Sequence, residues 1–389
     1  MSSENQVRGE NLLAQLSTVR AEVRRFLAEQ RAAGTYTRDA AGWDRYEPDF
    51  SRKIAQRGWI GMTWPRAYGG HERSVLERYV VTEELLTSGA PVRAHWLADR
   101  QIGPLLLNAG SESQKQFFLP RIAAGECFIC LAMSEPDSGS DLASIRTKAT
   151  RVDGGWRING RKVWISYAHK AHYMNLFART APATKENRHG GVTQFLVDLH
   201  SPGITISPIR NMAGEHDFNE ILIEDVFVTD DSVIGKVDQG WKQASGELAH
   251  ERSSPERWLN SYGVLVKLID CAGTRPAPTA AEKIGRLVTH VWTLHNMSFA
   301  IAARRAREIP GVTPDVAAAL MKDLGSQFDQ DIPEFARQVL QTEARTLMAE
   351  DHGFSAALEY ALLNAPSYSI RGGTREILRG IIARGLGLR

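Results

Sequence analysis

The spacing of apolar residues changes twice along this chain, and the two changes predict its architecture. Over residues 11–122 apolar side chains recur at helical spacing, as at Leu12 and Leu16. Residues 126–236 instead alternate in the manner of strands, with Gly, Pro, Asn and Asp between the runs. From Gly240 onward the helical period returns. The pattern therefore predicts a small β domain inserted between two helical blocks.

Length and charge limit the kind of protein this can be. A chain of 389 residues is longer than one typical hydrophobic core, so we expect two or three packed units. A net charge of +2 is too small to favour a nucleic-acid or membrane-surface partner. The N-terminus is polar and no apolar run reaches membrane-spanning length, so we expect a cytoplasmic location and no membrane partner.

The cysteines do not form a convincing metal or redox motif. Cys127 and Cys130 have C-x-x-C spacing, but they fall in an apolar run that favours a strand, where positions three apart face opposite ways. The third cysteine is Cys271, and none of the 11 histidines belongs to an H-E-x-x-H cluster. We expect small core cysteines and no metal.

The stretch from Leu131 to Ser166 has features of a cofactor site. Its first half is an apolar run that ends in a turn rich in Ser and Gly, where the backbone N–H groups of residues 138–140 could form a nest for a phosphate or pyrophosphate. After the Asp153-Gly154-Gly155 turn, Trp164 and Ser166 lie two apart on a predicted strand and so share a face. A planar cofactor could stack near Trp164 and bond near Ser166. A surface turn followed by an exposed strand fits the spacing as well.

A second candidate lies in the helix predicted after Gly240. Its apolar stripe contains Trp241, Ala244, Leu248, Pro255, Leu259, Tyr262 and Val266, and Glu251 falls on the same face between Leu248 and Pro255. A carboxylate on an inward helix face is costly unless it is paired or neutral. Pro255 predicts a kink because it cannot donate to the carbonyl of Glu251. Alternatively, residues 250–252 are a charged turn in which Glu251 pairs with an arginine.

These stretches resemble a known family. Residues 133–144, Met-Ser-Glu-Pro-Asp-Ser-Gly-Ser-Asp-Leu-Ala-Ser, and residues 159–166, Asn-Gly-Arg-Lys-Val-Trp-Ile-Ser, resemble the flavin-binding signature of the acyl-CoA dehydrogenases. Residues 58–70 and 218–228 are similar to further segments of the same family. The resemblance implies a mostly-α, α+β fold with an N-terminal helical domain (1–125), a middle β-barrel-like domain (126–238) and a C-terminal helical bundle (239–389).

The resemblance also implies a reaction and a cofactor. Members of the family use FAD to convert an acyl-CoA into a trans-2-enoyl-CoA, with a glutamate as the base that takes the α-proton. In most members this glutamate precedes a Gly-Thr pair, but here Gly372 stands in its place before Gly373 and Thr374. Isovaleryl- and long-chain-type members carry the base in a Glu-Arg pair on the helix after the β domain. Glu251-Arg252 matches that pair, so we expect Glu251 to be the base.

Further roles follow from the same resemblance. The backbone N–H of Gly372 would polarise the thioester carbonyl, and the substrate would contact Ser140, Arg252 and Gly373. Thr374 alone could be only a helix N-cap, and Arg252 alone could be a surface ion pair. The positions implied to bind the flavin are Leu131, Met133, Ser134, Gly139, Ser140, Trp164, Ile165, Ser166, Thr374 and Glu376.

Two family segments are missing, which bears on assembly. An Arg-x-x-Phe-Gly stretch is not recognisable over residues 265–286, and residues 338–350 lack a Gln-x-x-Gly-Gly-x-Gly stretch. In the family these segments hold the adenine end of FAD bound in a neighbouring subunit. We expect a homodimer or homotetramer that passes electrons to an electron-transfer flavoprotein. The alternatives are a non-catalytic or co-catalytic subunit of a hetero-oligomer, and a flavin oxidase or monooxygenase on the same fold.

Overall fold

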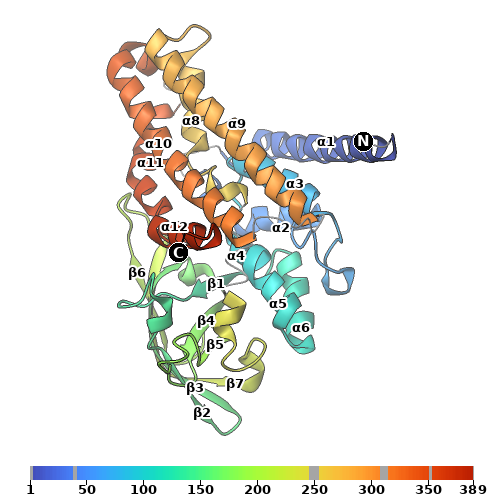
Figure 1. Cartoon of the computed structure of the whole chain (residues 1–389), viewed down its shortest axis with the longest axis vertical. Coiled ribbons are helices and arrows are strands. Elements are labelled where there is room, and N and C mark those ends of the chain that lie inside the picture. The colour runs from blue at the N-terminus through green and yellow to red at the C-terminus, as the bar shows by residue number, and fades with distance from the viewer. Residues whose placement is uncertain (1–2, 38–41, 245–253, 307–313, 350–352, 389) are drawn as a thin grey trace. The chain divides into compact units, whose positions relative to one another are not determined.

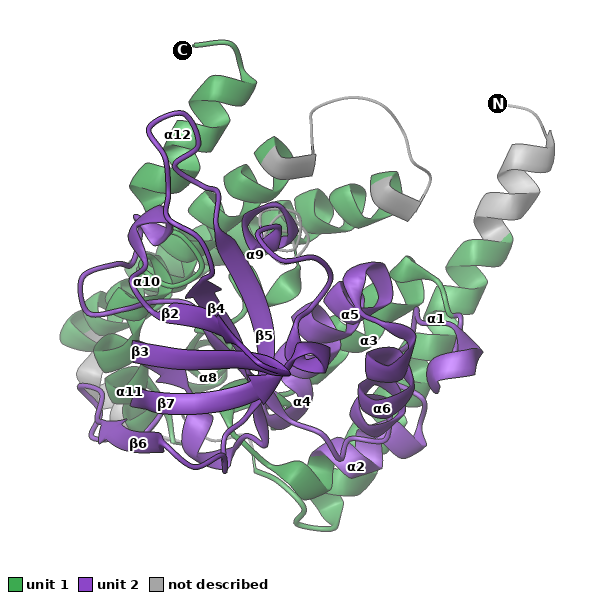
Figure 2. Ribbon diagram, turned by 90° about the horizontal axis from the view of Figure 1, so that it is seen from below, with its two compact units in different colours: residues 1–50, 73–92, 252–389 green, residues 51–72, 93–251 purple. Residues whose placement is uncertain are grey.

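The computed structural model describes residues 3–37, 42–244, 254–306, 314–349 and 353–388, so the predicted base Glu251 and its neighbour Arg252 lie outside the described residues. Helices make up 54% of the chain and strands 16%, which confirms the mostly-α, α+β class with one β domain. The chain divides into two compact units (Figure 2). Unit 1 comprises residues 1–50, 73–92 and 252–389, and unit 2 comprises residues 51–72 and 93–251.

Unit 1 is helical and is built around one long helix. Its helices are α1 (Ser3–Ala32), α3 (Val75–Thr87), α8 (Tyr262–Ala272), α9 (Pro278–Ala306), α10 (Pro314–Ala349), α11 (Phe354–Tyr368) and α12 (Arg375–Gly385). Helix α10 contacts α8, α9, α11 and α12, which lie around it in Figure 1. Small buried residues such as Ala318, Ala319 and Ala336 allow this close packing of helices.

The predicted helical stripe after Gly240 is not one continuous helix. The residues before α8 instead form a single 3₁₀ turn, Pro255–Arg257. Pro255 lacks an N–H to donate to a helical carbonyl, which favours the 3₁₀ turn that begins at this residue. Side chains then take the backbone groups that a helix would use: Asn260 Nδ2 donates to Glu256 O at 2.9 Å. The expectation of a continuous, kinked helix was therefore wrong over this segment.

Unit 2 combines short helices with a curled sheet. Its helical segments include the last residues of α2 (Pro48–Gln56), together with α4 (Arg93–Leu97), a π-helical turn (Ala98–Ile102), α5 (Gly103–Ala109) and α6 (Glu112–Ala123). Ser111 and Gln114 form a reciprocal capping box at the start of α6, in which each side chain bonds the other residue's backbone N–H.

Seven strands form the sheet of unit 2. They are β1 (Ile129–Ala132), β2 (Lys148–Val152), β3 (Gly155–Ser166), β4 (Tyr173–Arg179), β5 (Val192–Asp198), β6 (Ile204–Ile209) and β7 (Phe218–Thr229). The strand order is β1-β4-β2-β3-β7-β6, and β5 pairs with β4.

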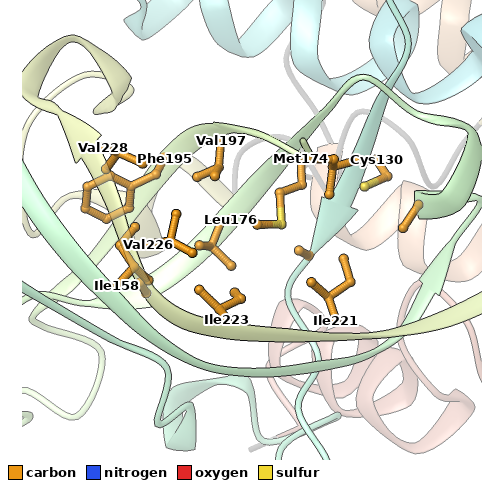
Figure 3. Packing of buried hydrophobic residues seen from close by; sticks show 14 of the residues in the cluster. Cys130, Ile158, Met174, Leu176, Phe195, Val197, Ile221, Ile223, Val226 and Val228 are labelled. Carbon is orange, nitrogen blue, oxygen red and sulfur yellow. The ribbon is translucent and has the colours of Figure 1, made fainter. Parts of the chain in front are cut away.

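The core of unit 2 lies inside the curled sheet. Ile158 of β3, Leu176 of β4, Phe195 of β5 and Val226 of β7 belong to one buried cluster, and Figure 3 shows their side chains together. Apolar residues that alternate along these strands account for this arrangement, because side chains of one face point the same way.

Cys127 and Cys130 are free and buried, as expected for small core residues. Burial raises the pKa of each thiol to about 12, so neither is a reactive thiolate. Within the described ranges, no helix is long and apolar enough to cross a membrane. The same ranges contain no group of three or more His, Cys, Asp and Glu side chains placed to hold a metal ion.

Candidate functional site

In unit 2, the loop after β1 is closed by its own backbone. Glu135 N–H donates to Ser138 O at 2.8 Å, and Ser138 N–H donates to Glu135 O at 3.0 Å. The predicted nest is therefore wrong at Ser138, because the N–H of that residue is already bonded within the turn. Gly139 and Ser140 are exposed, and no heavy atom outside its immediate chain neighbours lies within 4 Å of where a Cβ on Gly139 would be. Only these two residues of the nest remain open to a ligand.

A buried ion pair fixes this loop to strand β3. The Glu135 carboxylate accepts from Lys162 Nζ at 2.9 Å and from the backbone N–H groups of Arg146 and Thr147 at 2.6 and 2.9 Å. Lys162 Nζ also donates to Met133 O at 3.1 Å. Burial lowers the pKa of Lys162 to about 8, although Glu135 opposes that shift. Sequence reasoning missed this pair, although both residues belong to the quoted signature stretches.

Strand β3 carries a bulge where the flavin contact is predicted. Between the pairs Lys162–Ile221 and Ile165–Asn219, β3 advances three residues while β7 advances two. Trp164 occupies this bulge with φ of 60°, a left-handed conformation that is uncommon for a large side chain. Trp164 is 60% exposed, whereas Ile165 is buried. A large aromatic surface is thus presented outward beside the half-buried Ser166.

The neighbouring backbone of β3 is fixed by polar contacts. Asn219 Nδ2 donates to Ile165 O at 3.0 Å, and Asn219 Oδ1 lies 3.1 Å from His169 Nδ1 and 2.8 Å from His216 Nε2. Leu131, Met133 and Ser134 are half-buried at the end of β1. The predicted flavin positions within residues 131–140 and 164–166 therefore all belong to unit 2.

In unit 1, the loop between α11 and α12 contains the position of the usual family base. Gly372 and Gly373 have φ of 69° and 100°, which favour glycine. Lys322 of α10 donates from Nζ to Gly373 O at 2.8 Å. Arg371 donates to Asn260 Oδ1 at 2.6 Å and lies 3.5 Å from Asp44 Oδ2. The loop is thus held by residues far from it in sequence.

The space beside Gly372 is occupied by cationic side chains. A Cβ on Gly372 would lie 3.2 Å from Arg257 Nη1 and 3.4 Å from Lys322 Cε. Arg257 itself belongs to the 3₁₀ turn and is 9% exposed. A side chain at position 372 would therefore meet both positive charge and an unfavourable backbone conformation.

A buried aspartate supports the same region. Asp329 of α10 accepts from the Ser261 N–H at 3.1 Å and from Asn260 Nδ2, while Ser261 Oγ donates to Asp329 O at 2.7 Å. Burial raises the pKa of Asp329 to about 6. Because Asn260 also bonds Arg371, this aspartate indirectly positions the loop.

Thr374 immediately precedes α12, as predicted for an N-cap, but its side chain makes no capping hydrogen bond. The pKa of Glu376 is lowered by its own backbone N–H and by the Thr374 hydroxyl. Glu376 is exposed and Thr374 half-buried.

Sequence reasoning missed a second Glu-Arg pair, Glu256-Arg257, five residues after the first. The Glu256 side chain is buried, with the residue 4% exposed, and neither carboxylate oxygen has a hydrogen-bond partner in the described part of the chain. An unpaired buried carboxylate is costly, and such groups concentrate at functional sites. The repeated Glu-Arg dipeptide is the signal that could have drawn attention to it.

Comparisons with known proteins identify the family of this chain. Family models match the acyl-CoA dehydrogenase N-terminal domain at residues 14–126, the middle domain at 130–226 and the C-terminal domain at 238–387. Acyl-CoA dehydrogenase IpdE1 of Mycolicibacterium smegmatis is 30% identical, over 97% of this chain and 98% of that protein. Acyl-CoA dehydrogenase FadE34 of Mycobacterium tuberculosis is 33% identical over 96% of this chain, which spans about half (49%) of that longer protein.

Two solved structures have the same fold over nearly the whole chain. The Tcur3481-Tcur3483 steroid ACAD matches with a TM-score of 0.84 and 25% identity, covering 96% of this chain and 97% of that one. The ChsE4-ChsE5 complex from Mycobacterium tuberculosis matches with a TM-score of 0.80 and 27% identity, covering 96% and 98%. The chain belongs to the acyl-CoA dehydrogenase family and is an oxidoreductase whose cofactor is FAD.

Proposed function

We propose that the protein removes hydrogen from the α and β carbons of an acyl-CoA thioester, forms the trans-2-enoyl-CoA and passes the electrons to an electron-transfer flavoprotein. Membership of the family supports the reaction class. The observation that carries the proposal is that position 372 has no carboxylate and instead lies beside Arg257 and Lys322, whose Nη1 and Cε atoms would be 3.2 and 3.4 Å from a Cβ there.

The residues present fit FAD. Trp164 offers an exposed aromatic surface, and the open side of Gly139 and Ser140 offers backbone and hydroxyl donors. The residues that we assign to flavin binding are Leu131, Met133, Ser134, Gly139, Ser140, Trp164, Ile165, Ser166, Thr374 and Glu376. When bound, FAD supplies the acceptor for the hydride.

We assign the base to Glu251, with Arg252, Ser140 and Gly373 as substrate contacts and the N–H of Gly372 as a donor to the thioester oxygen. The departure at Gly372 supports a relocated base. At φ of 69° an L side chain is strained, and a glutamate there would sit beside two cations that hold it ionised and paired. A base in that environment would be weak, so the carboxylate has to come from elsewhere.

The substrate class and the assembly are also part of the proposal. One similar structure is named a steroid ACAD and another is a two-component complex, so bulky polycyclic acyl-CoA esters belong in the substrate panel. We retain a homodimer or homotetramer as the expected assembly, and a hetero-oligomer as its rival. We also retain three domains at 1–125, 126–238 and 239–389, which the three matched family segments support.

The test is anaerobic bleaching of the bound flavin across a panel of linear, branched and polycyclic acyl-CoA esters. We compare wild type with Glu251→Gln and with Glu256→Gln, the matched change in the second Glu-Arg pair. A positioned general base contributes about 10²–10⁴-fold to rate, so Glu251→Gln should slow bleaching by that factor while Glu256→Gln retains most of it.

Each of the other possible results would support a different base or a different function. If Glu256→Gln is the slow variant, the base lies in the second pair and the assignment of Glu251 is wrong. If a thioester binds but bleaches no flavin in the wild type, the chain is a supporting subunit of a hetero-oligomer. If the flavin is reduced only by substrates without CoA and reoxidised by O₂, the chain is an oxidase or monooxygenase.

A further inference from the structure

The Arg257 guanidinium lies where the side chain of the usual base would begin. Its Nη1 and Nη2 atoms are 3.2 and 3.4 Å from the position of a Cβ on Gly372. Gly372 and Gly373 stay half-buried, so the loop is partly accessible beside this guanidinium. The vacated position is therefore lined by a cation.

The backbone that carries Arg257 is rigidly placed. A Cβ on Gly325 of α10 would lie 2.2 Å from Arg257 O and 3.1 Å from Trp258 Cβ, so helix and turn are in direct contact. Pro255 restricts the turn from one side, and Asn260 bonds Glu256 O from the other. A side chain on such a support is suited to a precise polar contact.

The charge at this position favours an anionic oxygen. Lys322, fully buried, adds a second cation through its contact with Gly373 O. Arginine presents a planar set of N–H donors that matches carboxylate and similar oxygens, and in a desolvated setting its attraction to negative charge is stronger than in water.

We propose that Arg257 binds a negatively charged oxygen of the acyl group of the substrate at the Gly372 loop. Two oxygens have this chemistry: the thioester oxygen when the α-carbon is deprotonated, and a carboxylate carried further along the acyl chain. The inference rests on the proposed function, because it requires an acyl-CoA at this loop.

In the first case, removal of the α-proton places negative charge on the thioester oxygen. The base takes the α-proton, the C–H electron pair forms the double bond to the carbonyl carbon, and the carbonyl π pair moves to the thioester oxygen. Arg257 donates an N–H to that oxygen and keeps its proton. The return of a proton or deuteron to the α-carbon restores the thioester.

The test separates proton removal from hydride transfer. In 3-thiaoctanoyl-CoA sulfur replaces the β-carbon, so there is no β-hydrogen to transfer, and exchange of the α-protons with D₂O is followed by mass spectrometry. The same measurement, with calorimetric binding, uses the analogue with a terminal carboxylate. The variants are Arg257→Gln and Arg257→Lys, and the control is Arg379→Gln, which removes an arginine of α12 that bonds Asp323 of α10.

If Arg257 stabilises the thioester oxygen, Arg257→Gln should slow α-proton exchange of both analogues about 10²–10³-fold, as for loss of one oxyanion donor, with Arg257→Lys in between. If Arg257 binds a chain carboxylate, only the carboxylated analogue should lose affinity, by tenfold or more. Arg379→Gln should change neither quantity by more than about twofold.

Unchanged exchange and unchanged affinity in a folded Arg257→Gln protein would overturn the inference and leave Arg257 a structural residue. Thermal unfolding of each variant establishes that it is folded, and Arg257→Lys serves if Arg257→Gln is not. A wild type that neither exchanges the α-protons nor reduces its flavin would instead contradict the proposed function.

Discussion

In each of the two candidate loops a buried lysine donates to a backbone carbonyl, but the residues around that lysine come from different parts of the chain. In unit 2, buried Lys162 donates to Met133 O; in unit 1, buried Lys322 donates to Gly373 O. The partner that fixes Lys162 is Glu135, in the loop itself, whereas the residues around Gly372 come from α10 and the turn before α8. A loop stabilised within one short motif can be recognised in sequence, and a loop stabilised by distant helices cannot.

The largest expected effect tests the lysine of unit 2. Lys162→Met would leave the Glu135 carboxylate buried without its cation, which should lower the free energy of unfolding by about 3–5 kcal/mol. Lys322→Met removes a hydrogen bond to a carbonyl and should cost less, about 1–3 kcal/mol. Urea unfolding of both variants checks the order.

The double variant Glu135→Gln with Lys162→Met is the control, because it removes both charges. It should be more stable than Lys162→Met alone, since an unpaired buried charge costs more than the loss of a pair. A double variant less stable than Lys162→Met would contradict this account of the loop.

The next effect concerns the pH dependence that α10 brings to unit 1. The folded-state pKa of Asp329, about 6, is above its usual 3.8, so the stability that this group contributes is full below pH 3.8 and is lost as the pH rises through 6. The loss approaches about 3 kcal/mol by pH 7. Urea unfolding of wild type and Asp329→Asn between pH 4.5 and 7.5 should show their stability difference moving against the wild type as pH rises. A difference that stays constant would show that Asp329 does not titrate in this range.

A third effect tests the contact between α10 and the turn that carries Arg257. Gly325→Ala would place a Cβ 2.2 Å from Arg257 O, and overpacking of this kind costs about 1–3 kcal/mol. The matched control is Gly285→Ala on α9, where no heavy atom beyond the local helix lies within 4 Å. That change should stabilise by about 0.5–1 kcal/mol through helix propensity. The melting temperatures of the two variants should shift in opposite directions. Shifts in the same direction would mean that the backbone of α10 moves to make room at Gly325.

The smallest effect compares one glycine in each loop. Gly372→Ala has to keep φ of 69° beside Arg257, at a cost of about 1–2 kcal/mol. Gly139→Ala enters open space and should change stability by no more than about 0.5 kcal/mol. Equal costs in denaturant unfolding would remove the distinction between an open and a crowded loop.

More of unit 2 than of unit 1 could therefore be predicted from the sequence. The change of periodicity predicted the β domain, and the Ser-Glu-Pro-Asp-Ser-Gly-Ser and Lys-Val-Trp-Ile-Ser stretches led to the family. The bulge at Trp164 could not be predicted, because a tryptophan with positive φ has no sequence signal.

In unit 1 the sequence shows that position 372 is not a glutamate, but it does not show which side chains lie beside that position. Arg257 and Lys322 are separated from Gly372 by 115 and 50 positions, and their approach depends on how α10 and α12 pack. The continuous helix expected through Pro255 was wrong because side-chain hydrogen bonds replace helical ones: Asn260 donates to Glu256 O, and Asp329 accepts from the Ser261 N–H. No periodicity argument includes such partners.

The bulge in β3 also changes which side chains of the strand face inward. Lys162 and Val163 are consecutive residues and both are buried, after which Ile165 faces inward and Trp164 outward. Without the bulge, Trp164 would fall on the inward side with Lys162, because residues two apart on a regular strand share a face. The single inserted position thus lets one strand serve two surfaces: a lysine that anchors the loop from inside and an aromatic ring displayed to a ligand. A regular, unbulged pairing of the same residues would turn Trp164 inward and Ile165 outward, so the irregular pairing, more than the residue types, decides which side chain is displayed.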